Sequence, residues 1–149
     1  MSVLSVFPEA PQHDVRILAT DINSQVVAQA RAGVYPDEET SAISEAQKAR
    51  FMRTEGAASV QFAGPITRLP VFKVLNLNAE WPMRGLFDAI FCRNVVIYFD
   101  EQTRNRLWQR LADQLEYGGF LYIGHSEKIA CARQCGLEQV LPTIYEKRY

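Results

Sequence analysis

The stretch FDAIFCRNVVIYFD, residues 87–100, decides the fold class of this chain. It begins as a near-continuous apolar run, which is typical of a strand covered on both faces of a parallel sheet. Asp100 suits the N-cap of a following helix, in which leucines recur at positions 107, 111 and 115. The stretch therefore predicts a buried strand followed by a helix that packs against the sheet.

The same order of strand and helix occurs nearer the N-terminus. Residues 15–20 form a β-rich run that stops at Asp21 and is expected to be a buried strand. Asn23 or Ser24 can cap a helix after it, and Gly33 suits the end of that helix.

Weaker patterns fill the rest of the chain. Gly118-Gly119 is expected to end the central helix, and residues 120–123 form another buried strand. The other expected elements are a helix over 44–53 with Ser44 and Gln47 in capping-box spacing, a small hairpin with strands 59–62 and 66–68, an extended run over 71–75, a weak helix over 130–135, and β-like pieces near 140 and over 144–149. Strands that alternate with helices predict an α/β fold with a parallel sheet.

Length and composition fit one domain that covers residues 1–149. The chain is 48% apolar and 22% charged, which excludes intrinsic disorder. Its net charge of -1 gives no overall field that would predict binding to nucleic acid or to a membrane surface. No apolar run approaches the ~20 residues of a membrane span, and the N-terminus lacks the pattern of a secretory signal. Three cysteines, an odd number, favour the reducing cytoplasm.

Chemistry in an open α/β sheet is expected beyond the carboxyl ends of the strands. Four places qualify: Asp21, residues 76–78, residues 92–98, and residues 124–127. Asp21 could accept hydrogen bonds from both hydroxyls of a ribose, or it could cap the next helix, and spacing alone leaves the two readings equal.

The other candidates also carry two interpretations. Asn76 and Asn78 could read a base edge, although a turn after the strand is the favoured interpretation. Arg93 is placed to bind a carboxylate rather than to be an ordinary surface arginine. Tyr98 could position a reacting oxygen or could be a core tyrosine.

The common nucleotide and metal motifs are absent from the sequence. It contains neither G-x-G-x-x-G nor a G-x-x-x-x-G-K-[ST] loop. Cys131 and Cys135 lie four residues apart, but neither histidine is near them, so we expect no metal site. Cys92 has no histidine close by in sequence, so packing is expected rather than a nucleophilic role.

The motifs together resemble the CheR family of chemotaxis receptor methyltransferases. The resemblance rests on ILATDI (17–22), GVY (33–35), FDAIFCRNVVIYFD (87–100), GFL (119–121) and GHSE (124–127), and it runs from about residue 1 to residue 149. It implies transfer of a methyl group from S-adenosylmethionine to glutamate side chains of receptor cytoplasmic domains, with S-adenosylhomocysteine as the product. It also implies an S-adenosylmethionine methyltransferase-type Rossmann sheet.

The resemblance assigns a role to each candidate residue. Asp21 would hold the ribose hydroxyls, Asn76 and Leu77 would frame the adenine, and Cys92 and Arg93 would line the other side of the cofactor. Arg93 and Tyr98 would be the catalytic residues, with Tyr98 facing the methyl group. The hairpin, placed at residues 57–70, resembles the family's small β-subdomain, which in some members pairs with a receptor peptide.

The chain also departs from the family pattern. Members carry an N-terminal helical domain and a first strand with a G-x-S-T-G-E-E-P-Y-S-like loop, and residues 1–149 contain neither. We therefore expect a sheet that is incomplete at its N-terminal side, a homodimer or larger assembly through the open seam, and impaired methyl transfer. Two alternatives are a non-catalytic protein-binding module that keeps the fold and an S-adenosylmethionine enzyme that acts on a small molecule.

Overall fold

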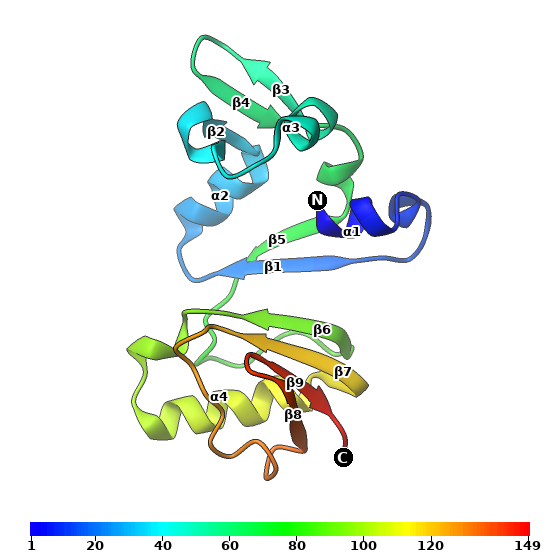
Figure 1. The fold of residues 1–149 in the computed structure, drawn as a ribbon. Helices are drawn as coiled ribbons and strands as arrows, with labels where there is room; N and C mark the ends of the chain where they lie inside the picture. Colours follow the sequence, from blue (N-terminus) through cyan, green and yellow to red (C-terminus); the bar gives the residue numbers. More distant parts are fainter. The chain divides into compact units, whose positions relative to one another are not determined.

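The computed structural model describes residues 1–149, which divide into two compact units, Met1–Asn76 and Leu77–Tyr149 (Figure 1). Each unit has its own buried apolar cluster. That the units together make one domain over residues 1–149 stays a prediction. No helix in the structure is both long enough and apolar enough to cross a bilayer.

The first unit contains a parallel strand pair and a small antiparallel sheet. β1 (Ile17–Asp21) pairs with β5 (Pro70–Val74) in parallel, with Asp21 opposite Val74. The other elements are α1 (Ser2–Val6), α2 (Ser24–Ala32), β2 (Val34–Pro36), α3 (Glu45–Phe51), β3 (Met52–Glu55), β4 (Ser59–Phe62), and the 3₁₀ helices Ala10–Gln12, Asp37–Thr40 and Gly64–Arg68.

Local sequence signals set the ends of the helices in this unit. The Asn23 side chain, rather than that of Ser24, caps α2 by accepting a hydrogen bond from the Gln25 N–H at 2.9 Å. Gly33 ends α2 in the left-handed conformation, with φ at 64°. Ser44 and Gln47 form the predicted capping box on α3.

The predicted hairpin was wrong in its second strand. Residues 66–68 lie in a 3₁₀ helix, and β4 pairs instead with β3 on one side and β2 on the other. Pro65 fixes φ and lacks an N–H, so it favours the first turn of a short helix over a ladder position. The strands of this antiparallel sheet lie within residues 34–62, and the small β-subdomain expected at residues 57–70 stays a prediction.

The second unit is a mixed four-stranded sheet with one long helix. The sheet has the order β6-β7-β9-β8, formed by Phe87–Cys92, Leu115–Ile123, Ile144–Lys147 and Leu137–Leu141. β6 and β7 are parallel, as the sequence predicts, whereas β9 is antiparallel to both of its neighbours. The 3₁₀ helix η4 (Val96–Tyr98) and helix α4 (Glu101–Asp113) connect β6 to β7.

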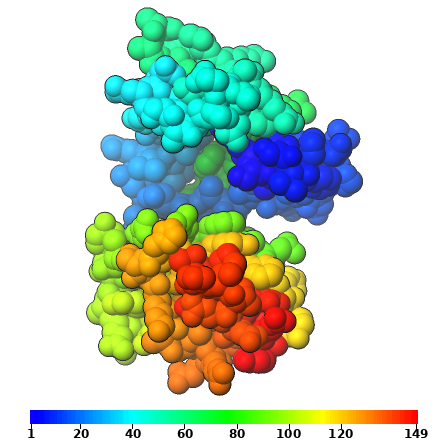
Figure 2. Space-filling model, in the orientation of Figure 1, coloured from blue at the N-terminus to red at the C-terminus, as the bar shows by residue number.

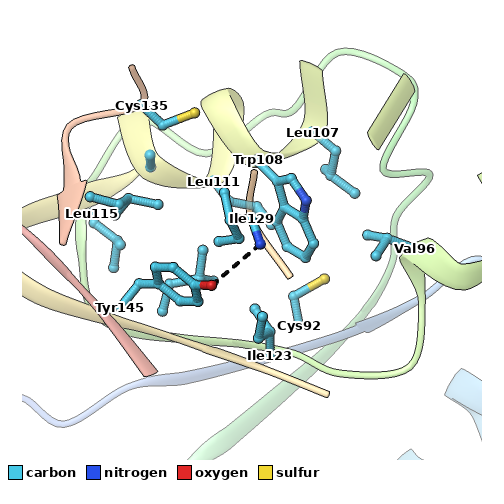
Figure 3. Packing of buried hydrophobic residues seen from close by; sticks show 13 residues of the cluster. Cys92, Val96, Leu107, Trp108, Leu111, Leu115, Ile123, Ile129, Cys135 and Tyr145 are labelled. Carbon is cyan, nitrogen blue, oxygen red and sulfur yellow. Dashed lines mark hydrogen bonds between the residues drawn. The ribbon is translucent and has the colours of Figure 1, made fainter. Parts of the chain in front are cut away.

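One face of this sheet and α4 enclose the core of the unit. Trp108 and Leu111 of α4 pack with Ile123 of β7 and Tyr145 of β9 (Figure 3). The hydroxyl of Tyr145 accepts a hydrogen bond from the Ile129 N–H at 3.3 Å, which satisfies two buried polar groups. In Figure 2 the visible surface of this unit is formed largely by residues after 120, coloured orange to red.

The start of α4 follows the sequence prediction. Asp100 accepts hydrogen bonds from the Thr103 N–H at 2.8 Å and the Thr103 hydroxyl at 2.9 Å. The backbone hydrogen bond from Thr103 is the main cause that lowers the pKa of the Asp100 carboxyl from its ordinary value.

Two further expectations for this unit were wrong. Residues 130–136 form turns rather than a helix. Gly118-Gly119 does not end the helix: α4 ends earlier, at Asp113, and the two glycines lie inside β7. The two glycines sit where the β6–β7 register jumps, and a Cβ on Gly119 would lie 2.9 Å from the Glu116 carbonyl oxygen.

The buried-strand prediction is also corrected. Cys92 of β6 faces the core, but Phe91 on the opposite face is 71% exposed and stacks on Tyr122. α4 covers one face of the β6–β7 pair, and no other helix of the second unit covers the opposite face. β1 is likewise only half-buried to exposed along its length.

Candidate functional site

Asp21 stands at the carboxyl end of β1 with one carboxylate oxygen engaged. Its Oδ1 accepts a hydrogen bond from the Asn23 N–H at 2.7 Å, and Asn23, not Asp21, caps α2. The side chain is exposed, and Oδ2 has no hydrogen-bond partner in the structure. The capping interpretation of Asp21 is therefore wrong, and its carboxylate keeps the capacity to accept hydrogen bonds from hydroxyl groups.

Asn76 lies at the same edge of the strand pair as Asp21. It follows β5 by two residues, and the Leu75 N–H donates to the Asp21 carbonyl at 3.0 Å. The structure thus brings these two predicted cofactor-binding residues to one end of one sheet.

Leu77 is held by its backbone at the start of the second unit. Its carbonyl oxygen accepts hydrogen bonds from Arg110 Nη1 at 2.7 Å and from Trp81 Nε1 at 3.2 Å. The Arg110 guanidinium also lies 4.0 Å from the centre of the Trp81 ring and donates to the Ala79 carbonyl. Arg110 of α4 therefore fixes the backbone of this segment.

A buried carboxylate organises the carboxyl ends of β6 and β7. Glu127 is 7% exposed and accepts four backbone hydrogen bonds. Its Oε1 receives the Val95 and Val96 N–H groups at 3.1 and 3.2 Å. Its Oε2 receives the Gly124 N–H at 2.6 Å and the Asn94 N–H at 3.2 Å. One side chain therefore ties the segment after β6 to the segment after β7.

The contact with Glu127 restricts which residues can occupy positions 94 and 124. Asn94 adopts a left-handed backbone conformation with φ at 58°, which asparagine tolerates better than most residues. A Cβ on Gly124 would lie 2.7 Å from Glu127 Oε2 and would also meet Asn94 Oδ1. Only glycine fits at position 124 beside the carboxylate.

Arg93 and Tyr98 flank the segment that Glu127 holds. Arg93 is exposed and has neither a hydrogen bond nor an ion pair in the structure. Tyr98 is 82% exposed, so the core interpretation of this tyrosine is wrong. Both side chains are therefore accessible to a ligand.

Cys92 has its side chain in the core. It is 6% exposed and lies near Trp108 and Ile123 (Figure 3). Burial, and secondly the charge of Glu127, raises the pKa of the Cys92 thiol to about 12. The structure supports the packing interpretation of the Cys92 side chain. Only the main chain of Cys92 could contact a cofactor.

The three cysteines are expected to differ sharply in reactivity. Burial first, and then the hydrogen bond with Cys131, raises the pKa of Cys135 to about 12 as well. At pH 8 a thiol with such a pKa has only ~1 molecule in 10,000 as the reactive thiolate. Iodoacetamide labelling followed by mass spectrometry should modify half-buried Cys131 first and leave Cys92 and Cys135 unmodified until urea is added. Labelling of native Cys92 as fast as Cys131 would contradict this burial.

Glu127 is the residue that sequence reasoning missed. The GHSE segment marked the end of a strand, but nothing in its spacing indicated that the carboxylate turns inward. Its partners at positions 94–96 lie more than thirty residues away. The one available signal was the position of Glu127 shortly after a buried strand. A carboxylate buried at such a position needs hydrogen-bond or charge partners, which would have indicated a structural role.

Comparison with known proteins identifies the family. Residues 1–143 match the family described as CheR methyltransferase, SAM binding domain. The chain belongs to the CheR family. The assignment made from the FDAIFCRNVVIYFD stretch and the flanking motifs is thereby confirmed, and S-adenosylmethionine binding is the role that the description gives this domain.

Several curated proteins are similar to this CheR chain. A probable chemotaxis protein methyltransferase of Rhizobium etli is 44% identical over 133 residues, covering 87% of this chain and 50% of the relative. The chemotaxis protein methyltransferase of Borreliella burgdorferi is 39% identical over 134 residues, covering 89% and 47%. That of Escherichia coli is 38% identical over 119 residues, covering 77% and 42%. The chain spans about half the length of the curated relatives that it matches.

A solved structure supports the fold. The N-methyltransferase NodS from Bradyrhizobium japonicum matches with a TM-score of 0.51 at 13% identity, covering 90% of this chain and 74% of that chain. At this identity the likeness concerns the fold alone. The CheR chain is a mixed α/β protein whose fold resembles that of a methyltransferase.

Proposed function

We propose that this CheR chain binds S-adenosylmethionine and serves the transfer of its methyl group to glutamate side chains of chemotaxis receptor cytoplasmic domains. The observation that carries the proposal is the family match over residues 1–143. The exposed carboxylate of Asp21 and the unpaired guanidinium of Arg93 add support, because both can still engage a ligand.

The proposal gives each assigned residue a role toward the cofactor. Asp21 would accept hydrogen bonds from ribose hydroxyls through the oxygen that Asn23 does not use. Asn76 and Leu77 would frame the adenine, and Arg93 with the main chain of Cys92 would line the other side. The cofactor, when bound, supplies an electrophilic methyl group on a sulfonium.

The chemistry asks for positioning more than for acid–base catalysis. A glutamate is already ionised at neutral pH, with an ordinary pKa of about 4.3. Arg93 would orient that carboxylate, and Tyr98 would pack beside the reacting carbon and exclude water. Glu127 fixes the backbone between these two residues, which limits how far either can drift.

Methyl transfer is tested with tritiated S-adenosylmethionine and receptor cytoplasmic fragments. Incorporation into glutamates as alkali-labile methyl esters is expected, at a rate below that of the Escherichia coli relative used as the positive control. Binding of S-adenosylhomocysteine without any ester formation would favour the non-catalytic module. Labelling of a small molecule alone would favour an S-adenosylmethionine enzyme that acts on small molecules. Either result would overturn the proposal.

The finer fold assignment also belongs to this proposal. It is a methyltransferase-type Rossmann sheet in a cytoplasmic protein, and the parallel pairs β1–β5 and β6–β7 support it. β1 has β5 as its one neighbour within the first unit, and β6 has β7 as its one neighbour within the second. Each is thus an edge strand in its own sheet.

Exposed edge strands predict self-association, because unpaired backbone groups pair with another chain. We expect this chain to form a homodimer or larger assembly. Sedimentation equilibrium at micromolar concentration should give a mass at least twice 16.9 kDa. A single species at 16.9 kDa over the whole concentration range would contradict the expected assembly.

A further inference from the structure

A groove of about 610 Å³ opens on the second unit, and none of the residues assigned to the cofactor lines it. One wall is the turn after β7, with His125, Ser126 and Lys128. The other wall is the end of β8 and the turn that follows, with Val140, Leu141 and Pro142. The volume lies within the ~300–1,000 Å³ of ordinary ligand pockets. Because the groove is open to solvent, it suits a segment of a protein.

Both walls are held in place by hydrogen bonds. The turn after β7 is held by Glu127, whose carboxylate accepts hydrogen bonds from four backbone N–H groups, including that of Gly124 in the turn itself. In the other wall, Gln139 Nε2 donates to the Pro142 carbonyl at 2.9 Å. The Ile123 N–H donates to the Thr143 carbonyl at 3.0 Å, which joins that wall to the end of β7. A preformed groove loses little conformational entropy on binding.

The chemistry of the walls selects an acidic, amphipathic occupant. Lys128 is exposed and has no ion pair in the structure. The carboxylate of Glu127, in contrast, is buried and already accepts four backbone hydrogen bonds. Lys128 is therefore the available charge in the groove. Val140 and Leu141 are large apolar side chains that are 38% and 57% exposed on the facing wall. A carboxylate beside Lys128 and an apolar side chain against Leu141 would satisfy both walls.

The groove adjoins the segment that carries the candidate catalytic residues. Glu127 Oε2 binds the Gly124 N–H and the Asn94 N–H together, and His125 begins the groove at the next residue. An occupant would therefore lie beside the stretch between Arg93 and Tyr98.

We propose that this groove binds the glutamate-bearing acceptor segment of the methylated protein. The proposal rests on the proposed function and adds the place where the acceptor docks on the second unit. Lys128 is a specificity contact for a carboxylate on that segment and takes no part in binding the cofactor.

The test uses a fluorescent amphipathic peptide that carries the receptor glutamates, with fluorescence anisotropy as the readout. Lys128→Glu should weaken peptide binding roughly tenfold, because a like charge replaces an attractive one. Arg133→Glu makes the same charge change on an exposed residue outside the groove and should leave binding unchanged. A peptide with glutamine in place of each glutamate should bind the wild-type chain more weakly than the acidic peptide does, because it loses the attraction to Lys128.

The outcomes separate this proposal from the proposed function. Equal peptide affinity of Lys128→Glu and the wild-type chain, equal binding of the glutamine peptide, or no binding of the acidic peptide at ~1 mM overturns the groove assignment. S-adenosylhomocysteine binding by the same proteins, measured by calorimetry, reports on the proposed function. It should be identical in the wild-type, Lys128→Glu and Arg133→Glu chains.

Discussion

Glu127→Ala is expected to destabilise the second unit by about 3 kcal/mol or more, since each buried polar group left unsatisfied costs ~1–3 kcal/mol. The substitution removes the acceptor of four backbone hydrogen bonds at the carboxyl ends of β6 and β7. Urea unfolding followed by tryptophan fluorescence measures the effect. Both tryptophans of the chain, Trp81 and Trp108, lie in the second unit, so the signal reports that unit.

Two further variants sharpen the Glu127 experiment. Glu127→Gln keeps the volume but replaces one acceptor oxygen with a donor, so its stability should fall between those of the wild-type and Glu127→Ala chains. Glu138→Ala removes an exposed partner of Arg148 and should cost less than ~1 kcal/mol. If Glu127→Ala unfolds at the same urea concentration as Glu138→Ala, Glu127 does not organise this edge of the sheet.

Asp21→Ala is expected to weaken S-adenosylhomocysteine binding roughly a hundredfold or more, because two charge-assisted hydrogen bonds of ~1.5–3 kcal/mol each are lost. The structure leaves Oδ2 of Asp21 exposed and directs Oδ1 to the Asn23 N–H, so the carboxylate is held in place at the strand end. Isothermal titration calorimetry gives the dissociation constants of the two proteins.

Matched variants separate the charge of Asp21 from its turn contact. Asp21→Asn can still accept from the Asn23 N–H but lacks the charge, so its affinity should lie between those of the other two chains. Asp14→Ala removes an equal charge from an exposed residue that pairs with Arg16, and it should bind as the wild type does. Unchanged affinity in Asp21→Ala would exclude the ribose contact.

Elements governed by neighbouring residues could be predicted from the sequence. Asn23, Ser44 and Asp100 each accept a backbone hydrogen bond from two or three residues further on, so their capping role is visible in the local sequence. The strands that end at Asp21 and Cys92 also follow from short apolar runs.

Features set by distant residues could not be predicted in this way. Strand β4 pairs with β2, more than twenty residues earlier, and no local pattern indicates that choice. Glu127 reaches across thirty-one to thirty-three residues to the segment after β6. The sequence placed Asp21, Asn76 and Arg93 at strand ends but could not say which of their polar atoms the fold itself would use.

The most direct test of the account is a titration of the ¹⁵N-labelled chain with S-adenosylhomocysteine, followed by amide chemical shifts. The predicted result is a saturable change at the residues assigned to the cofactor, which are Asp21, Asn76, Leu77, Cys92 and Arg93, while the groove residue Lys128 stays unperturbed. Saturation that leaves these five amides unchanged, or no change anywhere at millimolar ligand, would contradict the claim that this chain is a cofactor-binding methyltransferase domain.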